Sequence, residues 1–248
     1  MDLLIKNMSL KVSSAISPFR SYVLLAALTF FWGLNWPAMK LVLSEVPVWW
    51  FRSICLLGGG AGLMLISFFS GQRILLERRE WRQLLACGLF LVIGWHLFTG
   101  YGVSQMPAGR AVIIAFTMPL WASAFSAVLL KERLTKRKII ALLIGLLGLS
   151  VLTGPDIFVV KTAPIGALLM LGAAISWAIG TVLFKFFNWS ASTMAVAGWL
   201  LLFGAIPITI GAVFWEVPLV VSLISKNIWI ALVYVIVFPM TFCQWWYL

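Results

Sequence analysis

The feature that most constrains this chain is a series of long apolar stretches, separated by short connections that hold most of the charged residues. A transmembrane helix takes about 20 apolar residues, and a backbone in lipid must satisfy its own hydrogen bonds. The chain is 63% hydrophobic and 10% charged, whereas soluble domains are about 45 to 50% apolar. The sequence therefore predicts an all-α membrane protein, a polytopic helical bundle. Its eight expected spans cover residues 22–39, 46–70, 83–106, 111–130, 139–153, 165–187, 191–215 and 228–248.

The formal net charge of +11 could indicate a nucleic-acid partner, but the basic residues lie in short clusters between the apolar stretches. The largest cluster occupies residues 131–138. Because Lys and Arg gather on the cytoplasmic side of membrane proteins, this pattern places the N-terminus in the cytoplasm. The expected partners are the lipid bilayer and a small-molecule substrate, with a homo-oligomer left open and no nucleic acid.

Reactive groups are sparse inside the predicted spans. Cys55, Cys87 and Cys243 lie in apolar stretches without metal-ligand spacing, and no Gly-rich phosphate-binding loop is present. An embedded enzyme would need facing acids, metal ligands or an activated nucleophile. We therefore expect no catalytic residue, no metal and no cofactor, and a protein that is not an enzyme. The seven acids all fall in connections or at span ends: Asp2, Glu45, Glu77, Glu80, Glu132, Asp156 and Glu216.

A shift of 145 residues lays the first three spans on the last three without a gap, so that Trp32 falls on Trp177 and Lys40 on Lys185. The alignment of spans and connections carries more weight here than the identical letters. If each unit has five spans, the odd number inverts the second unit, which is the plan of many secondary transporters. The expected division is a cytoplasmic segment 1–20, a first repeat 21–153, a connection 154–164 and a partial second repeat 165–248.

Polar residues inside the spans are the candidates for a solute site. Asn35 shares a helical face with Trp32, and either bonds a neighbouring helix or lines a solute cavity. Arg52 and Arg110 lie toward the outer ends of their spans. These two bases either extend to the headgroups or attract an anionic group in a shared outer cavity. For Lys40, extension to the headgroups is the favoured interpretation.

The third span carries the single histidine, His96, with Thr99 on the same face. Such a histidine either makes a packing hydrogen bond or titrates near neutral pH. Gly145 and Gly148 would give the fifth span a close-packing edge, and the mid-span prolines Pro119, Pro207 and Pro239 are expected to kink their helices. The predicted substrate-binding set is Trp32, Asn35, Arg52, His96, Thr99, Arg110, Trp177 and Gln244.

Taken together, several stretches of the first repeat resemble the EamA-like branch of the drug/metabolite transporter superfamily. They are Trp-Gly-Leu-Asn at 32–35 with Lys40, then Arg52, Pro-Ala-Gly-Arg-Ala at 107–111, Thr-Met-Pro-Leu at 117–120, Leu-Lys-Glu-Arg-Leu-Thr at 130–135, and Gly145 with Gly148. The resemblance implies a bacterial inner-membrane exporter of small metabolites, amino acids or drugs that works by alternating access. It also implies ten helices in two inverted five-helix repeats.

The resemblance covers the first repeat well and the second mainly by its spans. Residue 248 falls inside the eighth span, so the chain is expected to be truncated, by about 50 residues at the usual rise per residue. Two alternatives to an active exporter remain open. One is a non-transporting remnant or partner subunit, and the other is a flippase for lipid-linked sugars.

Overall fold

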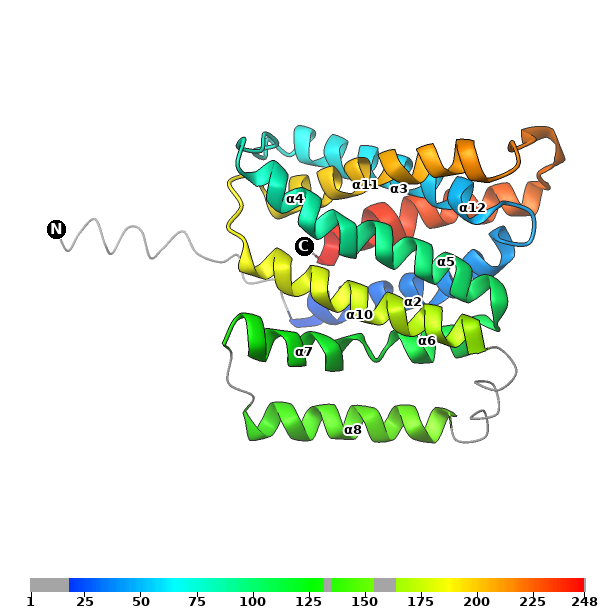
Figure 1. Cartoon of the computed structure of the whole chain (residues 1–248). Coiled ribbons are helices and arrows are strands. Elements are labelled where there is room, and N and C mark those ends of the chain that lie inside the picture. The colour runs from blue at the N-terminus through cyan, green and yellow to red at the C-terminus, as the bar shows by residue number, and fades with distance from the viewer. Residues whose placement is uncertain (1–17, 132–134, 154–163, 248) are drawn as a thin grey trace.

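The computed structural model describes residues 18–131, 135–153 and 164–247. Most of the predicted segment 1–20 and of the connection 154–164 lies outside these residues, as do Asp2, Glu132 and Asp156. Figure 1 shows long helices lying side by side. In chain order they are α2 (Pro18–Val42), α3 (Val48–Phe69), α4 (Glu80–Gly88), α5 (Trp95–Gln105), α6 (Ala108–Ala115), α7 (Met118–Leu129), α8 (Lys136–Thr153), α10 (Pro164–Phe186), α11 (Thr193–Trp215), α12 (Lys226–Val237) and α13 (Cys243–Tyr247).

The described residues contain seven helical segments that are long and apolar enough to cross a membrane. Each matches a predicted span to within a few residues, because hydropathy determines where a chain can enter lipid. The predicted fifth span, 139–153, is covered by α8, whose first turn carries three bases, Lys136, Arg137 and Lys138. The structure confirms an all-α polytopic membrane protein. The seven segments are Ser21–Val42, Val48–Phe69, Glu80–Gln105, Ala108–Leu129, Pro164–Phe186, Thr193–Trp215 and Lys226–Trp246.

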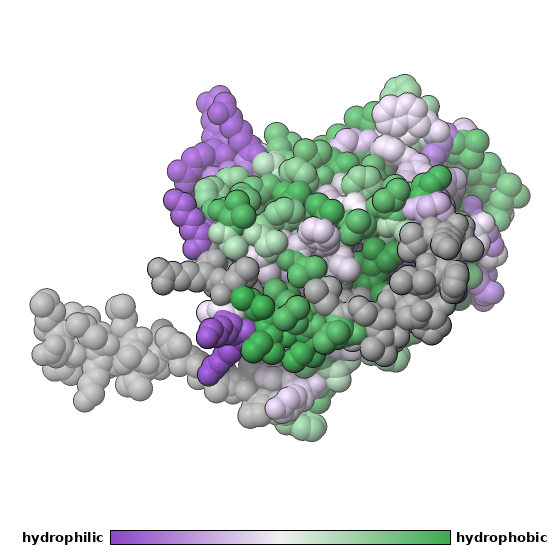
Figure 2. Space-filling model, turned by 60° about the horizontal axis from the view of Figure 1, so that its bottom comes forward, coloured by the Kyte–Doolittle hydropathy of each residue, from purple (hydrophilic) through white to green (hydrophobic). Residues whose placement is uncertain are grey.

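The outside of the bundle is apolar along its flanks. Large hydrophobic side chains such as Leu147, Leu168 and Phe214 are exposed there. Figure 2 shows hydrophobic side chains over the flank, with hydrophilic ones gathered toward the ends. This distribution is the one expected of a surface that faces lipid along its length and water at its two ends.

Helix breaks occur in three of the membrane-spanning segments: Glu80–Gln105, Ala108–Leu129 and Lys226–Trp246. A π-helical segment, η2 (Leu89–Gly94), joins α4 to α5, and a second one, η5 (Phe238–Phe242), joins α12 to α13 and contains Pro239. The fourth span is broken between α6 and α7, where Pro119 stands at the start of α7. Pro207, in contrast, lies within the continuous helix α11.

The packing of the helices follows the 145-residue shift found in the sequence. The shift places α2 on α10 and α3 on α11, and it places the third span, Glu80–Gln105, on the segment Lys226–Trp246. In the structure α3 packs along α11, α10 packs on α5 and η2, and α12 packs on α2. Each first helix thus contacts the third span of the opposite half. Such an exchange is the arrangement expected of two repeats related by a two-fold axis.

Individual contacts between α3 and α11 are also related by the 145-residue shift. The Ser53 and Thr209 hydroxyls form a hydrogen bond between α3 and α11. The shift converts this pair into Gly198 and Met64, and a Cβ at Gly198 would lie 2.9 Å from the Met64 Sδ. The two helices therefore approach closely at both equivalent places, through hydroxyl groups at one and through a glycine at the other.

Glycines in the second span, on α3, allow this close approach. A Cβ on Gly60 would lie 2.8 Å from the Leu202 Cγ, so only glycine fits against α11. The prediction that two glycines give α8 a close-packing edge is wrong. Gly145 and Gly148 are both exposed, with no atom within 4 Å of an added Cβ. The physical reason is position, since α8 stands at the edge of the bundle and packs on α6.

Candidate solute-binding site

The site is built on the first turns of α3. Two residues before the helix is Val46, which is buried, and Pro47 fixes the backbone just ahead of Val48. Glu216 then accepts hydrogen bonds from the Trp49 and Trp50 backbone N–H groups, each at 3.1 Å. Because a carboxylate at a helix N-terminus satisfies orphan donors, Glu216 anchors the start of α3.

Arg52 lies about one turn into α3 and is only 1% exposed. Its Nη2 donates to the Thr99 Oγ1 at 2.8 Å and approaches the Met39 Sδ at 3.3 Å. Its Cζ also lies 4.8 Å from the centre of the Phe51 ring. The guanidinium is thus held between α2, α3 and α5, so the prediction that it could extend to the headgroups is wrong for this structure.

Thr99 orients that contact. Its hydroxyl donates to the Trp95 carbonyl at 2.7 Å, which leaves the oxygen free to accept from Arg52. His96, one turn earlier on α5, is 4% exposed, and its Nδ1 has no hydrogen-bond partner. The Arg52 Nε is likewise buried without a partner. Two polar nitrogens with unused hydrogen-bonding capacity therefore lie in the same buried region.

No carboxylate in the described part of the chain compensates the Arg52 charge. Each of the four acids there is engaged elsewhere. A buried charge is costly unless it is paired, so a guanidinium in this position favours an anionic partner. The acids and their partners are Glu45 with Ser225, Glu77 with Arg73, Glu80 with Ser190, and Glu216 with Trp49 and Trp50.

Asn35 supplies a hydrogen-bond acceptor on α2, one helical turn before Met39. Its Oδ1 is buried without a partner, and Met39, four residues later on α2, contacts Arg52. Side chains four residues apart lie on the same helical face, with Cβ atoms about 5 to 6 Å apart. Asn35 and Arg52 therefore border the same side of the α2, α3 and α5 junction.

Lys40 has a different role from the one predicted. Its Nζ donates to the carbonyls of Val103 and Ser104, both at 2.8 Å, near the end of α5. The last carbonyls of a helix lack intrahelical partners and attract cations. Lys40 therefore caps α5 rather than extending to the headgroups, and it holds α2 against the helix that carries Thr99 and His96.

The other predicted residues lie on further helices around the junction. Trp177 on α10 faces Trp95 on α5, with ring centres 6.5 Å apart. Arg110 is partly buried at the start of α6, a helix that packs on α2, α5 and α10. Trp32 on α2 and Gln244 on α13 are partly buried as well. The structure thus brings Arg52 and Thr99 into contact, with His96 one turn from Thr99, whereas Arg110, Trp177 and Gln244 belong to other helices.

Sequence reasoning missed Met39 and Glu216. Met39 lies between Asn35 and the predicted Lys40, and only the packing of α2 on α3 reveals that its sulfur contacts Arg52. Glu216 directly follows α11 and resembles an ordinary acid at a helix end. Its partners, Trp49 and Trp50, are far away in the sequence, so no local pattern could have identified the contact.

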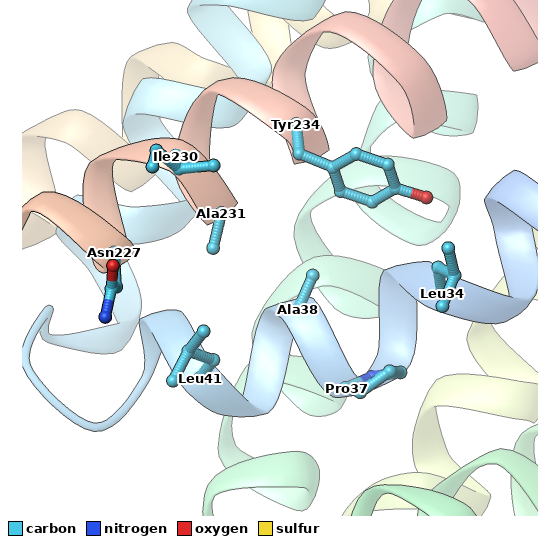
Figure 3. Close-up of a pocket in the computed structure, with 8 residues that line it drawn as sticks. All are labelled: Leu34, Pro37, Ala38, Leu41, Asn227, Ile230, Ala231 and Tyr234. Atoms are coloured by element: carbon cyan, nitrogen blue, oxygen red, sulfur yellow. The ribbon is translucent and has the colours of Figure 1, made fainter.

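A separate groove of about 460 Å³ lies between α2 and α12. Figure 3 shows Ala38 and Ala231 facing each other across it. Its walls are mostly apolar, and none of the eight predicted substrate-binding residues lines it. The lining residues are Leu34, Pro37, Ala38, Leu41, Asn227, Ile230, Ala231 and Tyr234.

Comparison with known proteins gives similarity to membrane transporters. The sequence model of the EamA-like transporter family matches residues 19–154, more than half of the chain. The uncharacterized transporter YvbV of Bacillus subtilis (strain 168) is 30% identical over 226 residues, covering 85% of this chain and 71% of that protein. The uncharacterized transporter YoaV of the same strain is 26% identical over 191 residues, covering 77% and 65%.

Two further matches bear on function and fold. A protein of Salmonella typhimurium named probable amino-acid metabolite efflux pump is 27% identical over 155 residues, which is 62% of this chain and 50% of that protein. A solved crystal structure superposes with a TM-score of 0.67 at 24% identity, covering 89% of this chain and 76% of the other. That likeness supports the fold alone.

Proposed function

Because the chain belongs to the EamA-like transporter family, we propose that it is a secondary transporter that exports small metabolites, amino acids or drugs by alternating access. The amino-acid metabolite efflux named for a similar protein supports this substrate range. The exchange of contacts between the two halves supports a mechanism in which the halves move against each other around a central site.

The proposed location is the bacterial cytoplasmic membrane, with the N-terminus in the cytoplasm. Among the described residues, bases concentrate at the end of the bundle that holds the connections 70–79 and 187–192, with Arg73, Arg78, Arg79 and Arg82 there. The opposite end, with the connections 43–47, 106–107 and 216–225, carries fewer bases. The positive-inside rule therefore favours a cytoplasmic position for the first of these ends.

The observation that carries the proposal is the buried, acid-free environment of Arg52. A cation inside a membrane bundle is costly and marks a functional pathway more often than a packing contact. The proposed solute site lies among Trp32, Asn35, His96, Thr99, Trp177 and Gln244, with Arg52 and Arg110 orienting an anionic group.

The test is export from cells that express the chain. Cells are loaded with a panel of labelled amino acids, and the rate of loss is compared with that of cells carrying Arg52→Gln or Asn35→Ala. Surface-exposed Arg73, which pairs with Glu77, offers a matched control in Arg73→Gln. We expect faster loss of at least one solute with the wild-type chain and the control only. Equal loss from every variant at equal membrane levels would remove the proposed site.

A role as a partner subunit is the second candidate. The side of α2 is uncovered, whereas other helices cover α10, the repeat equivalent of α2. In the apolar 18-residue window of α2, 6% of residues are buried, against 39% in the window of α10, a helix that is covered by α6 and α7. Gly33 has no atom within 4 Å of an added Cβ, whereas its equivalent Ala178 is fully buried. Cross-linking of a cysteine at position 33 to a second polypeptide, without transport by the isolated chain, would favour this alternative.

Labelled lipid-linked sugar in the export panel tests the flippase variant.

A further inference from the structure

We infer that Arg52 binds a carboxylate of the solute, and that the site selects solutes that carry a single carboxylate. This inference rests on the proposed transport function and names the substrate class of the same site. It comes from the unused hydrogen-bonding capacity of Arg52 and from the distribution of bases in the two halves.

One edge of the guanidinium has hydrogen-bonding capacity that the protein does not use. Thr99 fixes the Nη2 by a hydrogen bond of 2.8 Å, whereas the Nε has no partner and is buried. The remaining contact of Nη2 is with the Met39 thioether, which is a weak acceptor. A carboxylate can accept from Nε and displace the sulfur, giving the two-point contact that arginine forms with planar oxyanions.

The limit of one carboxylate on the solute follows from the lack of a second buried base near Arg52. It is the single buried Lys or Arg among the residues that the structure describes. Lys40 is engaged by two carbonyls, and the repeat equivalent of Arg52 is Ala197, so the second half supplies no matching base. Arg110 is less buried than Arg52 and lies on another helix, at the start of α6. A second buried negative charge on the solute would remain uncompensated.

Binding to the purified full chain tests this inference. The probes are L-leucine, L-leucinol, which lacks the carboxylate, and L-glutamate, which carries a second one. We expect stabilisation by leucine only, and an affinity about tenfold weaker or worse in Arg52→Gln. Arg52→Lys should retain part of the affinity, and Arg73→Gln all of it. Equal binding of leucine and glutamate, no binding of leucine, or full affinity in Arg52→Gln would overturn the inference. Transport of leucinol by the wild-type chain would preserve the transporter function while removing the charge selection.

A second inference comes from two glutamates at opposite ends of the bundle. Glu80 accepts from the Ser190 backbone N–H and, at 2.8 Å, from the Ser190 hydroxyl. At the other end, Glu45 accepts from the Ser225 backbone N–H at 2.8 Å. The 145-residue shift places Glu45 on Ser190 and Glu80 on Ser225, so it converts each pair into the other.

The geometry points to a pair of latches, one closing each end of the bundle. Each joins an acid of the first half to a serine of the second half, and alternating access opens one end at a time. The latches are unequal. Glu80 is 1% exposed and accepts a third bond from the Glu77 backbone N–H, at 2.7 Å. Glu45 is exposed and has one donor. The stronger Glu80 latch therefore favours the state in which its end is closed.

Paired spin labels at the two ends test the latches in the full chain. Exposed positions suited to labelling are Arg78 with Asn188 at the Glu80 end, and Ser44 with Leu223 at the Glu45 end. Glu80→Gln should lengthen the first distance only, and Glu45→Gln the second only. Ser190→Ala removes one donor and should cause a smaller change than Glu80→Gln, while Glu77→Gln should leave both distances unchanged. Unchanged distances in both glutamate variants, or lengthening at the same end in both, would overturn the proposal.

Discussion

Arg52 on α3 and Thr99 on α5 are joined by a hydrogen bond of 2.8 Å, which fixes a buried guanidinium between two helices that cross the membrane. The Thr99 hydroxyl also donates to the Trp95 carbonyl, so its direction is set by its own helix. This bond connects the packing of the bundle to the proposed chemistry of the site, because the position of Arg52 depends on Thr99.

Replacing Thr99 by Val should weaken solute binding and mildly destabilise the protein. The substitution keeps the shape of the side chain but removes the acceptor of Arg52, and a lost buried partner costs about 1 to 3 kcal/mol. Thr99→Ser should keep most of the solute affinity and of the stability, since its hydroxyl can make the same two bonds. Thermal unfolding and solute affinity are the measurements. Normal affinity in Thr99→Val would show that Arg52 does not need this support.

Replacing Lys40 by Met should lower stability without changing which solutes are transported. The Lys40 ammonium caps α5 through the Val103 and Ser104 carbonyls, and hydrogen bonds to a charged group contribute about 1.5 to 3 kcal/mol. We expect a lower melting temperature and an unchanged order of solute preference in transport. A changed preference for charged solutes would instead place Lys40 in the solute site.

A leucine at Gly60 should disrupt the bundle, whereas one at Gly148 should be tolerated. A side chain at Gly60 would collide with Leu202 and separate α3 from α11, and overpacking costs about 1 to 3 kcal/mol or more. Gly148 faces open space on α8. Membrane level and melting temperature of the two variants, measured together, give a direct comparison. Equal tolerance of both substitutions would contradict the observed α3 and α11 packing.

Replacing Glu216 by Gln should weaken the start of α3. The carboxylate accepts from two backbone N–H groups, and the loss of a helix N-terminal cap costs about 0.5 to 2 kcal/mol. The amide can accept only one of these bonds well. Hydrogen exchange of the Trp49 and Trp50 amides should become faster than in the wild-type chain, while amides in the middle of α11 should not change. Unaltered exchange at Trp49 and Trp50 would mean that water can replace the cap.

The fold was largely predictable because hydropathy alone determines which segments enter lipid. The predicted span 46–70 became Val48–Phe69, and 191–215 became Thr193–Trp215. The environment of individual polar residues was less predictable. Arg52 looked able to reach the headgroups from its place near a helix end, and only the packing of α2 and α5 against α3 shows that it is enclosed.

Contacts between distant segments were the part that sequence reasoning could not supply. Glu45 and Glu80 resembled ordinary acids at span ends, and their serine partners follow more than a hundred residues later. The repeat shift relates the two pairs, but a shared shift alone does not predict a contact. Gly145 and Gly148 had the small-residue pattern of a packed edge, yet no local pattern determines which helix lies at the edge of a bundle.

Solute counterflow in proteoliposomes that contain the full chain, either wild-type or Arg52→Gln, tests directly whether Arg52 belongs to a transport site. Uptake of labelled L-leucine into vesicles preloaded with unlabelled L-leucine is followed, with Arg73→Gln as control. We predict counterflow with the wild-type chain and the control, and its loss in Arg52→Gln at the same protein level and orientation. Counterflow of equal rate in Arg52→Gln would contradict this prediction.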